Sequence, residues 1–569
     1  MKRKLLCLVL SAVFVFSGIV MSACSTTAGT DTTGGEDGEK KKNDSTLVRS
    51  PMTLTLWVPT DENTTAESIS QVEAALNKIT QAKYSTAIEL HAVAYDKYED
   101  QLNARMKSIK EILDQTEADK KARKEAERAA RKRGETLAPE TTAETEDPNA
   151  SSGATVNEYG MTFPSVTSTQ LDIFLIKGYD NFKKYSEDLL LSSITDELNG
   201  NSKLIKSYVY PTFLDMAQTF NSNYAVPNNH PLGEYTYLLV NKELCDSYYY
   251  DIDSMDTLLN CKDFILDVAK NANITPLLTT TDIPGLHYWS EDGSFSFLAS
   301  MISDDQDPTS KLNIRNVFGL KPFVNTTLRL KELQEAGAIG TNPDEKNFGV
   351  GVIKGDAKAV KEYKDKYYIK VLEKPRATTD DVFESMFAVS TYTKDVSRSM
   401  EILKLLNTDT EFRTILQYGV KGVNWTEETD PETKETVLKV LNNDYIMNIV
   451  DTGNVFITYP GDGLPMSYWD DYRQQNLDSL LYPLIKFQDY IDDDNKEYFD
   501  EMKSYSAEIY SRISKMSAKE FEEAAASIKE EIADSVIYNI MVDDKSTEAG
   551  YDSLIVKYTS FYNENFKNK

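Results

Sequence analysis

Short apolar runs and amphipathic stretches alternate in the first third of the chain. Residues 53–58 and 88–93 are rich in apolar and β-branched residues, which is typical of buried strands. In residues 69–79 and 98–113, apolar residues recur every three or four positions, as expected of helices that cover a sheet. Strands that alternate with helices predict a parallel, wound sheet, so the expected fold class is α/β.

The helix of residues 69–79 has a possible start signal, because Thr64 and Glu67 have the spacing of a capping box. Further along, residues 171–176 form another buried-type strand. Short strands are predicted at residues 349–353, 367–372 and 386–390. After them the pattern is mainly helical to the end of the chain.

A hairpin-like stretch lies near the middle of the chain, at residues 224–244. Residues 235–240 alternate like a strand, and polar turn residues separate them from a short extended piece before Pro227. Asn241 is placed to cap a helix that begins at Lys242. Two strands joined in this way suit a crossing between two lobes, or a surface hairpin inside one domain.

Residues 115–155 look like an insertion. Residues 115–135 are mostly charged residues and alanine, which favours a helix without an apolar stripe. Residues 136–154 have a disorder-prone composition. A basic patch at Arg128, Arg131, Lys132 and Arg133 has the charge to contact an anionic polymer, although a solvated helix is the simpler interpretation.

The N-terminus has the features of an export signal. Residues 1–4 are basic and residues 5–20 are apolar over a length short for a membrane span. Small residues precede Cys24, and this segment resembles the lipobox of bacterial lipoproteins. The resemblance implies that residues 1–23 are removed and that Cys24 carries a lipid; the alternative is an ordinary secretory signal. Residues 25–44 contain no large apolar residue, so residues 24–50 are predicted to be a flexible tether.

Composition limits the possible partners. The chain has 569 residues, enough for two or more domains, and 40% of them are hydrophobic. Its net charge is -29, which argues against a nucleic-acid partner and for a soluble surface. An exported location permits a disulfide between Cys245 and Cys261; two buried thiols are the alternative.

Sequence motifs for catalysis are absent. The chain has three histidines, and it lacks metal-type spacing, nucleophile elbows and phosphate loops. We therefore expect no cofactor, no metal site and no enzymatic activity. The four tryptophans fall at strand ends or in loops, where α/β sheets bind ligands and where an indole can stack on a sugar ring. Core packing is the alternative for each of them.

The segments above resemble, in order, the extracellular solute-binding lipoproteins of ABC importers, in the carbohydrate-binding group with the maltose-binding type of fold. The segments that carry the resemblance are the lipobox, TLTLWVPTDENTT (53–65), LDIFLIKGYDNFKKY (171–185), YAVPNN and GEYTYLLVNKEL (224–244), FAVS (387–390), SMEILKLLNTD (399–409), LQYGVKGVNW (416–425) and TGNVFITYP (452–460). The similarity covers most of the chain from residue 53, apart from residues 115–154. Asn424 and Trp425 stand where relatives carry an aromatic after the second glycine, so ligand choice is not implied.

The resemblance implies a periplasmic-binding-protein-like (type II) fold: two α/β lobes, a hinge of crossing strands and a helical C-terminal tail. We expect the first lobe to hold residues 51–230 and 387–430, and the second to hold residues 231–386 and 431–569. Crossing strands should lie near residues 225–237 and 387–390. The implied partners are a sugar or oligosaccharide, the permease subunits of an ABC transporter, and the membrane through Cys24. We expect a monomer at the outer face of a bacterial membrane.

Within that fold, solute would bind in the cleft between the lobes. Tryptophan faces would stack on a sugar, and Asp61, Asp180 and Glu234 would accept its hydroxyl hydrogens, while a glycine lets the backbone approach. The candidate ligand-binding residues are Trp57, Thr60, Asp61, Gly178, Tyr179, Asp180, Glu234, Tyr235, Trp289, Trp425 and Trp469. Two other readings remain open: a surface carbohydrate-active enzyme, and a sensor lipoprotein that signals to a membrane receptor.

Overall fold

The computed structural model describes residues 49–133, 154–219, 222–279, 286–288, 298–301, 314–342, 344–481 and 496–536. Arg49–Lys569 form one compact unit, distinct from Met1–Val48. The predictions for the signal, for Cys24, for most of the tether and for Trp289 therefore lie outside the described residues.

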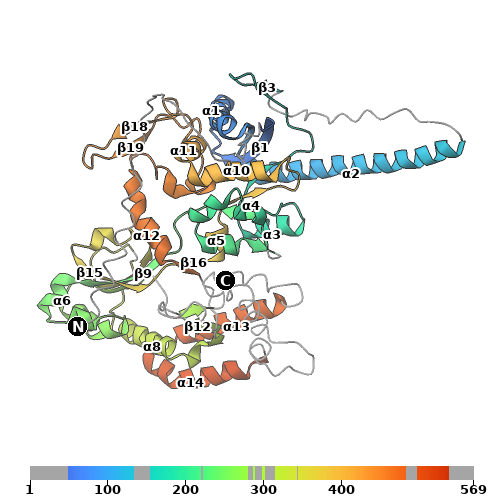
Figure 1. Ribbon diagram of the computed structural model, residues 1–569. Coiled ribbons are helices and arrows are strands. Elements are labelled where there is room, and N and C mark those ends of the chain that lie inside the picture. Colours follow the sequence, from blue (N-terminus) through green and yellow to red (C-terminus); the bar gives the residue numbers. More distant parts are fainter. Residues whose placement is uncertain are drawn as a thin grey trace, which may run out of the picture. The chain divides into compact units, whose positions relative to one another are not determined.

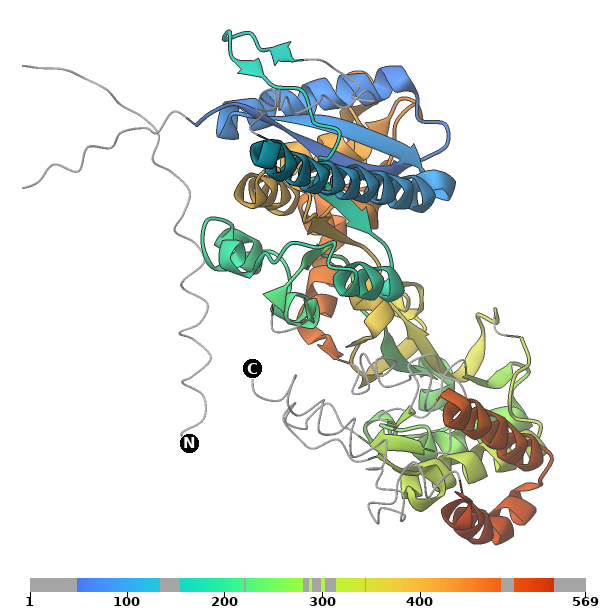
Figure 2. The same cartoon turned by 90° about the vertical axis from the view of Figure 1, so that its right-hand side faces the viewer.

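A five-stranded sheet forms the core of the first lobe (Figures 1 and 2). Its order is β2-β1-β5-β17-β8, with β1 (Met52–Thr60), β2 (Thr86–Ala94), β5 (Ile173–Ile176), β17 (Met386–Val389) and β8 (Ala225–Pro227). The first three strands are parallel, and β17 runs antiparallel to both of its neighbours. The α/β fold class is therefore confirmed, since helices α1 (Ala66–Tyr84), α2 (Tyr95–Arg133), α10 (Val396–Thr408) and α11 (Thr410–Tyr418) contribute apolar faces to the same core.

The start of α1 differs from the capping box predicted at Thr64. Thr65 is the N-cap, and its side chain accepts a hydrogen bond from the amide of Ser68. The reason is the neighbouring loop: the amide of Thr65 donates to the carbonyl of Asp444 at 2.9 Å, which holds the chain at that residue.

A second sheet of four strands has its own core. The order is β10-β14-β9-β15, with β9 (Tyr235–Asn241), β10 (Thr275–Thr279), β14 (Phe348–Gly355) and β15 (Tyr367–Glu373). Helices α6 (Lys242–Ser247) and α7 (Lys262–Asn271) pack on it, and Asn241 caps α6 as predicted. Helix α8 (Lys321–Glu335) contacts α14 (Ala518–Asp534), which follows α13 (Lys496–Ser514). Cys245 and Cys261 are buried free thiols here, which corresponds to the second of the two alternatives for this pair.

The other elements connect or flank these two layers. They are β3 (Thr155–Val156), β4 (Thr162–Phe163), α3 (Tyr179–Glu187), α4 (Thr195–Asn199), α5 (Pro211–Met216), β6 (Gln218–Thr219), β7 (Ser222–Asn223), β11 (Leu286–Tyr288), β12 (Leu298–Met301), β13 (Ile314–Asn316), β16 (Arg376–Ala377), α9 (Thr379–Phe383), β18 (Trp425–Thr429), β19 (Thr436–Val440), α12 (Asp470–Asp478) and β20 (Leu480–Leu481).

Within the described residues, three passages of the chain connect the lobes. The first is the turn between β8 and β9, and the second is the segment from β16 to β17. The third is α12 with β20, which pairs with β16 in parallel. Within α12, Gln475 Nε2 donates to the carbonyls of Leu232 and Gly233 at 3.0 and 2.7 Å, and Asn476 Nδ2 donates to the carbonyl of His230 at 2.8 Å.

The third passage lies later in the chain than the predicted boundary at residue 430. Tyr445 and Met447 belong to the core cluster of the first lobe, with exposures of 1% and 3%. Their side chains fill that core because Tyr445 donates its hydroxyl hydrogen to the carbonyl of Leu416 in α11 at 2.9 Å. The chain from residue 431 to this point therefore packs with the first lobe, and only the later helices pack with the second.

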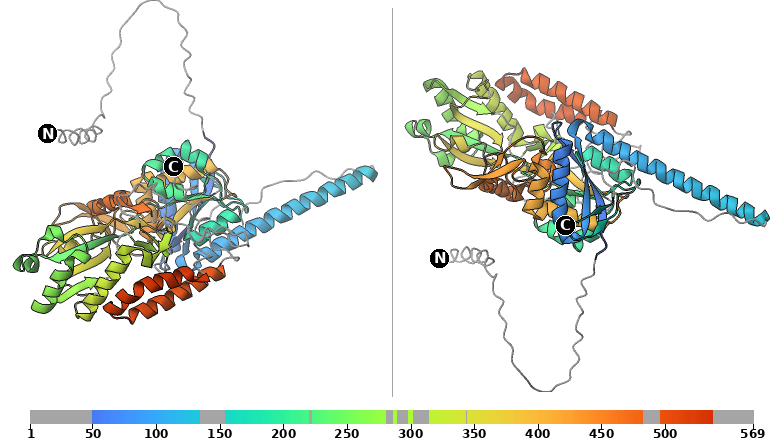
Figure 3. Two further views of the ribbon diagram at one scale, coloured as in Figure 1. Left: turned by 90° about the horizontal axis from the view of Figure 1, so that it is seen from below. Right: turned by 90° about the horizontal axis from the view of Figure 1, so that it is seen from above.

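Helix α2 has two unlike halves. Near its start, Tyr98, Leu102, Met106 and Ile109 are buried against the first sheet. Beyond Asp114 nearly every described side chain is exposed, and the helix runs away from the packed elements (Figure 3). The charged stretch predicted to begin at residue 115 is thus the continuation of a single 39-residue helix. In the described part of the chain, no helix combines the length and the apolar composition needed to cross a membrane.

Candidate functional site

The carboxyl ends of β1, β2 and β5 meet at one edge of the first sheet because these strands are parallel. In open α/β sheets, ligands bind at this edge. Strand β1 ends at Thr60, and β5 ends at Ile176 and is followed by Lys177 and Gly178. The first and second passages to the other lobe, at the end of β8 and the start of β17, leave from the same edge.

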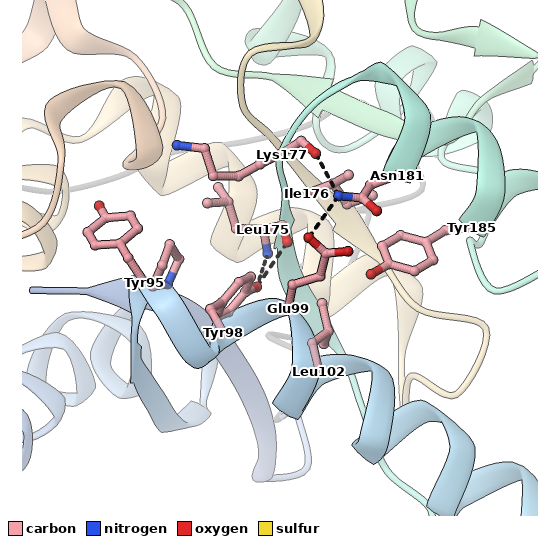
Figure 4. A pocket seen from close by; sticks show the side chains of 10 residues that line it. Tyr95, Tyr98, Glu99, Leu102, Leu175, Ile176, Lys177, Asn181 and Tyr185 are labelled. Atoms are coloured by element: carbon pink, nitrogen blue, oxygen red, sulfur yellow. Dashed lines mark hydrogen bonds between the residues drawn. The ribbon is translucent and has the colours of Figure 1, made fainter. Parts of the chain in front are cut away.

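A small cavity of about 80 Å³ opens at this edge (Figure 4). Known sites for whole small molecules are about 300–1,000 Å³, so this cavity fits only part of a solute. The lining residues are Pro59, Tyr95, Tyr98, Glu99, Leu102, Leu175, Ile176, Lys177, Asn181 and Tyr185.

The floor of the cavity is held by Tyr98. Its hydroxyl accepts a hydrogen bond from the amide of Leu175 at 3.0 Å and lies 2.9 Å from the carbonyl of the same residue. It also lies 3.1 Å from the carbonyl of Trp57 in β1. Burial raises the pKa of Tyr98 well above its ordinary value, so the side chain stays a neutral phenol. Tyr98 therefore joins α2 to two strands and has a structural role.

A polar rim is formed by Lys177, Asp451 and Tyr95. Lys177 Nζ lies 3.0 Å from Asp451 Oδ2 and 5.7 Å from the centre of the Tyr95 ring. Asp451 is fully buried, and its Oδ1 atom has no hydrogen-bond partner among the described residues. Burial, followed by the charge of Asp451, raises the pKa of Tyr95 far above its ordinary value. Lys177 and Tyr95 thus line the cavity with an ammonium group and a neutral phenol, and the buried Asp451 pairs with Lys177.

A second pair of polar groups stands on the other wall (Figure 4). Asn181 Nδ2 donates to the carbonyl of Lys177 at 3.0 Å and to Glu99 Oε2 at 3.3 Å. Glu99 is exposed on α2, whereas Asn181 lies in the first turn of α3. Planar amide and carboxylate groups beside an apolar wall suit the hydroxyls and the carbon face of a sugar.

The loop that supplies Asp451 is positioned by hydrogen bonds to Asp61, directly after β1, and to Tyr95 at the start of α2. The amide of Asp61 donates to the carbonyl of Ile446 at 3.3 Å. The amide of Asn448 donates to the hydroxyl of Tyr95 at 2.8 Å. These contacts bring Asp451 next to Lys177, which is 274 residues away in the sequence.

Five of the predicted site residues lie at this edge: Thr60, Asp61, Gly178, Tyr179 and Asp180. Thr60 is buried, and Asp61 Oδ1 accepts from the amide of Asn63 at 2.9 Å. Gly178 has a φ of 78° with open space where a Cβ would stand, so it leaves room beside the cavity. Tyr179 is only 6% exposed and packs edge-on against Phe383 at 4.8 Å, while Asp180 is exposed.

The three predicted indoles that the structure describes, Trp57, Trp425 and Trp469, are buried. Trp57 is 9% exposed and stacks on His91 at 4.5 Å. The indole N–H groups of Trp425 and Trp469 donate to the carbonyls of Gly419 and Thr458. Both rings are buried, Trp425 packing against Tyr459 and Trp469 against Phe456. Their role in binding stays a prediction.

The two hinge residues differ from each other. Tyr235 is buried, and its hydroxyl donates to Asp478 Oδ2 at 2.8 Å. Glu234 is exposed and lies 3.9 Å from Lys354. Among the described residues, no group of three or more His, Cys, Asp and Glu side chains is arranged to hold a metal ion.

Sequence reasoning missed Tyr95, Glu99, Lys177, Asn181 and Asp451. Lys177 had a usable signal, since it directly follows a buried strand. Tyr95 follows β2 in the same way, but the strand was predicted to end before Ala94. Asp451 had no local signal, because only the tertiary fold brings its loop to this edge.

No family model matches the chain. A carbohydrate ABC transporter substrate-binding protein of Streptococcus pneumoniae is 30% identical over 101 residues, which cover 18% of this chain and 21% of that protein. The N-glycan transport solute binding protein NgtS of S. pneumoniae has a TM-score of 0.51 at 15% identity, over 91% of this chain and 99% of NgtS. The chain has the fold of a solute-binding protein.

The expected two-lobed fold is thus confirmed. An extracellular solute-binding protein from Bifidobacterium longum subsp. infantis is also similar, with a TM-score of 0.45 and 13% identity over 90% of this chain and 98% of that one. The curated relative is matched over about a fifth of its length, 21%.

Proposed function

We propose that this protein is the solute-binding component of an ABC importer and that it captures a sugar or oligosaccharide between its lobes. The observation that carries the proposal is the small cavity at the carboxyl edge of the first sheet, which Lys177 and Tyr95 line and where the buried Asp451 pairs with Lys177. The two-lobed fold and the local similarity to a carbohydrate-transport protein support it.

In this proposal the cavity receives one part of the sugar. Glu99 accepts hydroxyl hydrogens, Lys177 and Asn181 donate to hydroxyl oxygens, and the buried Asp451 holds the Lys177 ammonium in place. Gly178 lets the chain approach the solute, and Asp61 and Asp180 add acceptors at the rim. The remaining predicted residues, Glu234, Tyr235, Trp57, Tyr179, Trp289, Trp425 and Trp469, are proposed to reach solute or to support the site from behind.

Transport requires no covalent chemistry from this chain. A solute that contacts both lobes stabilises the closed form by its difference in affinity for the closed and open forms. The closed form is then the one that the permease subunits receive. We therefore propose a binding protein without enzymatic activity, without a cofactor and acting as a monomer.

The test combines a screen with a matched pair of variants. A thermal-shift screen of sugars and glycan fragments identifies a ligand, and calorimetry measures its affinity. The double variant Glu99→Ala and Asn181→Ala should bind at least about tenfold more weakly, since a hydrogen bond to a charged group contributes about 1.5–3 kcal/mol. Glu111→Ala, an exposed change on the same helix, is the control. Wild-type affinity in the double variant would remove the cavity from the site.

Two other outcomes would change the assignment. Hydrolysis of any oligosaccharide in the panel would indicate a carbohydrate-active enzyme. Sugar binding without transport, in cells that lack only this protein's gene and are complemented with it, would favour a sensor that passes ligand status to a membrane receptor.

We also propose that the mature chain begins at Cys24 and is held at the outer face of a bacterial membrane by a lipid on that residue. The basic and apolar segments before Cys24 support this location. The variant Cys24→Ala should appear in the medium or remain uncleaved, because the thioether needs the thiol. A processed variant that stays in the membrane fraction would contradict the proposal.

A further inference from the structure

The distal half of α2, residues 114–133, carries a row of unpaired cations. Four of them, Lys120, Lys124, Arg128 and Lys132, are spaced four residues apart. The fifth, Lys121, follows Lys120 and lies on the same side of the helix. At about 100° per residue, these five side chains fall within about 120° of the helix circumference and along about 18 Å of its axis. We call them the basic stripe.

Every side chain of the basic stripe is exposed. Within the described part of the chain, none of the five has a hydrogen bond or an ion pair. Of the nearby acids, Glu127 pairs with Arg123 at 3.3 Å and Glu125 borders the stripe, whereas Glu117 lies on the same face, one turn before Lys120 and Lys121. The rest of the circumference is rich in alanine, at Ala118, Ala122, Ala126 and Ala129. A helix that is merely solvated does not need its positive side chains gathered on one side.

The charge of the stripe is opposite to that of the chain as a whole, which is -29. Charges separated by more than a Debye length of about 8 Å are largely screened at physiological salt. The distal half of α2 extends for about 30 Å at 1.5 Å per residue, and it runs away from the packed elements (Figures 1 and 3). A stripe on this projection can meet an anionic surface while the acidic body stays at a distance.

We propose that the basic stripe docks on the anionic phospholipid headgroups of the membrane to which the chain is tethered. The inference rests on the proposed anchoring at Cys24. A segment of the length of residues 24–48 spans at most about 80–90 Å even when fully extended, so a lipid on Cys24 would keep the body close to the same membrane. Two weak signals are what stable membrane association requires.

The consequence is an oriented body. A single flexible tether leaves a solute-binding protein free to rotate, whereas a second contact at the end of α2 restricts which side of the two lobes faces the membrane. Each cation that approaches an anionic membrane strengthens binding severalfold. A stripe of five such residues is therefore sufficient for measurable binding without the lipid.

The test measures vesicle binding directly. The probe is a vesicle of phosphatidylcholine with about 30% phosphatidylglycerol, compared with phosphatidylcholine alone. The protein is the chain from residue 24 carrying Cys24→Ser, so that no lipid contributes; Arg49–Lys569 form a compact unit without the removed signal. In the stripe variant Lys120, Lys124, Arg128 and Lys132 are changed to Gln. In the control variant the exposed lysines Lys270, Lys361, Lys364 and Lys515 are changed to Gln.

The expected result is binding of the wild type and of the control variant to anionic vesicles only. The stripe variant should bind at least about tenfold more weakly, and about 0.5 M salt should abolish the difference. Equal binding of the stripe variant and the wild type, or no binding by the wild type, would overturn the proposal. So would an equal loss in the control variant, since that would show a general charge effect.

Two further measurements separate the alternatives. Sedimentation of the protein alone would reveal self-association that the stripe variant loses, and that result would assign the stripe to a second copy of the chain and overturn membrane docking. Calorimetry with the sugar found in the screen should give the same affinity for the wild type and the stripe variant. Failure of sugar binding in both, with vesicle binding intact, would count against the proposed function and not against this inference.

Discussion

At the residue scale, the hinge depends on a position that only glycine can occupy. Gly233 has a φ of 57°, and a Cβ added there would stand 2.6 Å from the carbonyl oxygen of Arg376. A non-bonded Cβ is essentially never found that close to another heavy atom, so either the turn or the β16 strand would have to move. The close approach exists because the first and second passages of the hinge lie against each other.

We expect Gly233→Ala to lower the free energy of unfolding by more than about 2 kcal/mol. A left-handed backbone alone costs about 1–2 kcal/mol for a residue with a Cβ, and the clash with Arg376 adds to it. The control is Gly463→Ala, where φ is 73° but nothing lies within 4 Å of the added atom. Urea unfolding measures both free energies. Equal losses in the two variants would show that the hinge can shift to accommodate the added Cβ at little cost.

The two cysteines of the second lobe give a prediction about pH. Burial raises the pKa of the Cys261 thiol from 9.0 to about 12. The unfolded chain releases this proton near the ordinary value, so the folded protein holds it more tightly. Stability should therefore be unaffected below pH 9.0 and fall as the pH rises toward 12, by about 1.4 kcal/mol per unit.

Urea unfolding at high pH tests this with Cys261→Ala as the comparison, because that variant lacks the titrating thiol and should show a shallower decline. A thiol reagent at neutral pH should label neither cysteine in the folded protein and both Cys245 and Cys261 after unfolding. An absence of labelling after unfolding would instead indicate a disulfide.

At the element scale, the two halves of α2 are stabilised by different interactions. Its first half is amphipathic and packs through residues such as Ile109, which is fully buried. Its second half has a buried side chain at Ala130 and partly exposed ones at Arg123 and Glu127, and its other described side chains are exposed. Tertiary packing explains the first half, and intrinsic propensity with charge pairing explains the second.

Replacing residues 115–154 by a short Gly-Ser linker should change the free energy of unfolding by less than about 1 kcal/mol, because little apolar surface is lost. Ile109→Ala, on the same helix, should cost about 2–4 kcal/mol through the cavity that it leaves. Denaturant unfolding of both proteins checks this difference. A loss of several kcal/mol on deletion would mean that the segment packs on the body.

At the scale of the whole molecule, α12 ties the two lobes through one side chain. Gln475 is 1% exposed. Its amide donates to two carbonyls of the first hinge passage, at Leu232 and Gly233, and its oxygen accepts from the amide of Ala357, which follows a strand of the second sheet. All of the partners are backbone groups, so the contact holds the course of the chain.

Gln475→Leu should lower the free energy of unfolding by about 2–4 kcal/mol, since it leaves buried carbonyls and an amide without partners. It should also alter sugar affinity, because the open and closed forms differ at the hinge. The neighbouring Gln474→Leu, which removes only an exposed hydrogen bond to Asp478, is the control. Unfolding and calorimetry on the two variants decide whether α12 is part of the hinge.

The local sequence pattern was sufficient to predict the strands and helices whose apolar residues recur with one clear period. The runs at β1, β2 and β5 and the cap at Asn241 follow from a few adjacent residues, because burial on a sheet and hydrogen bonding at a helix start are short-range effects. Thr60, Asp61 and Gly178 were placed at the edge for the same reason. The prediction of the cap at Thr64 missed by one residue since a distant loop, at Asp444, holds Thr65.

Only the tertiary structure decided which side chains meet. Asp451 reaches Lys177 because residues 444–451 fold back over the end of β1, and no spacing in the sequence encodes that contact. The tryptophans illustrate the same limit: position at a strand end suggests exposure, but Trp425 and Trp469 are enclosed by aromatic neighbours from other segments. The sequence by itself determined the α/β class, the strand ends and the basic stripe on α2. Long-range packing determined the lobe boundaries, the polar rim and the third hinge passage, because these depend on contacts between residues far apart in the chain.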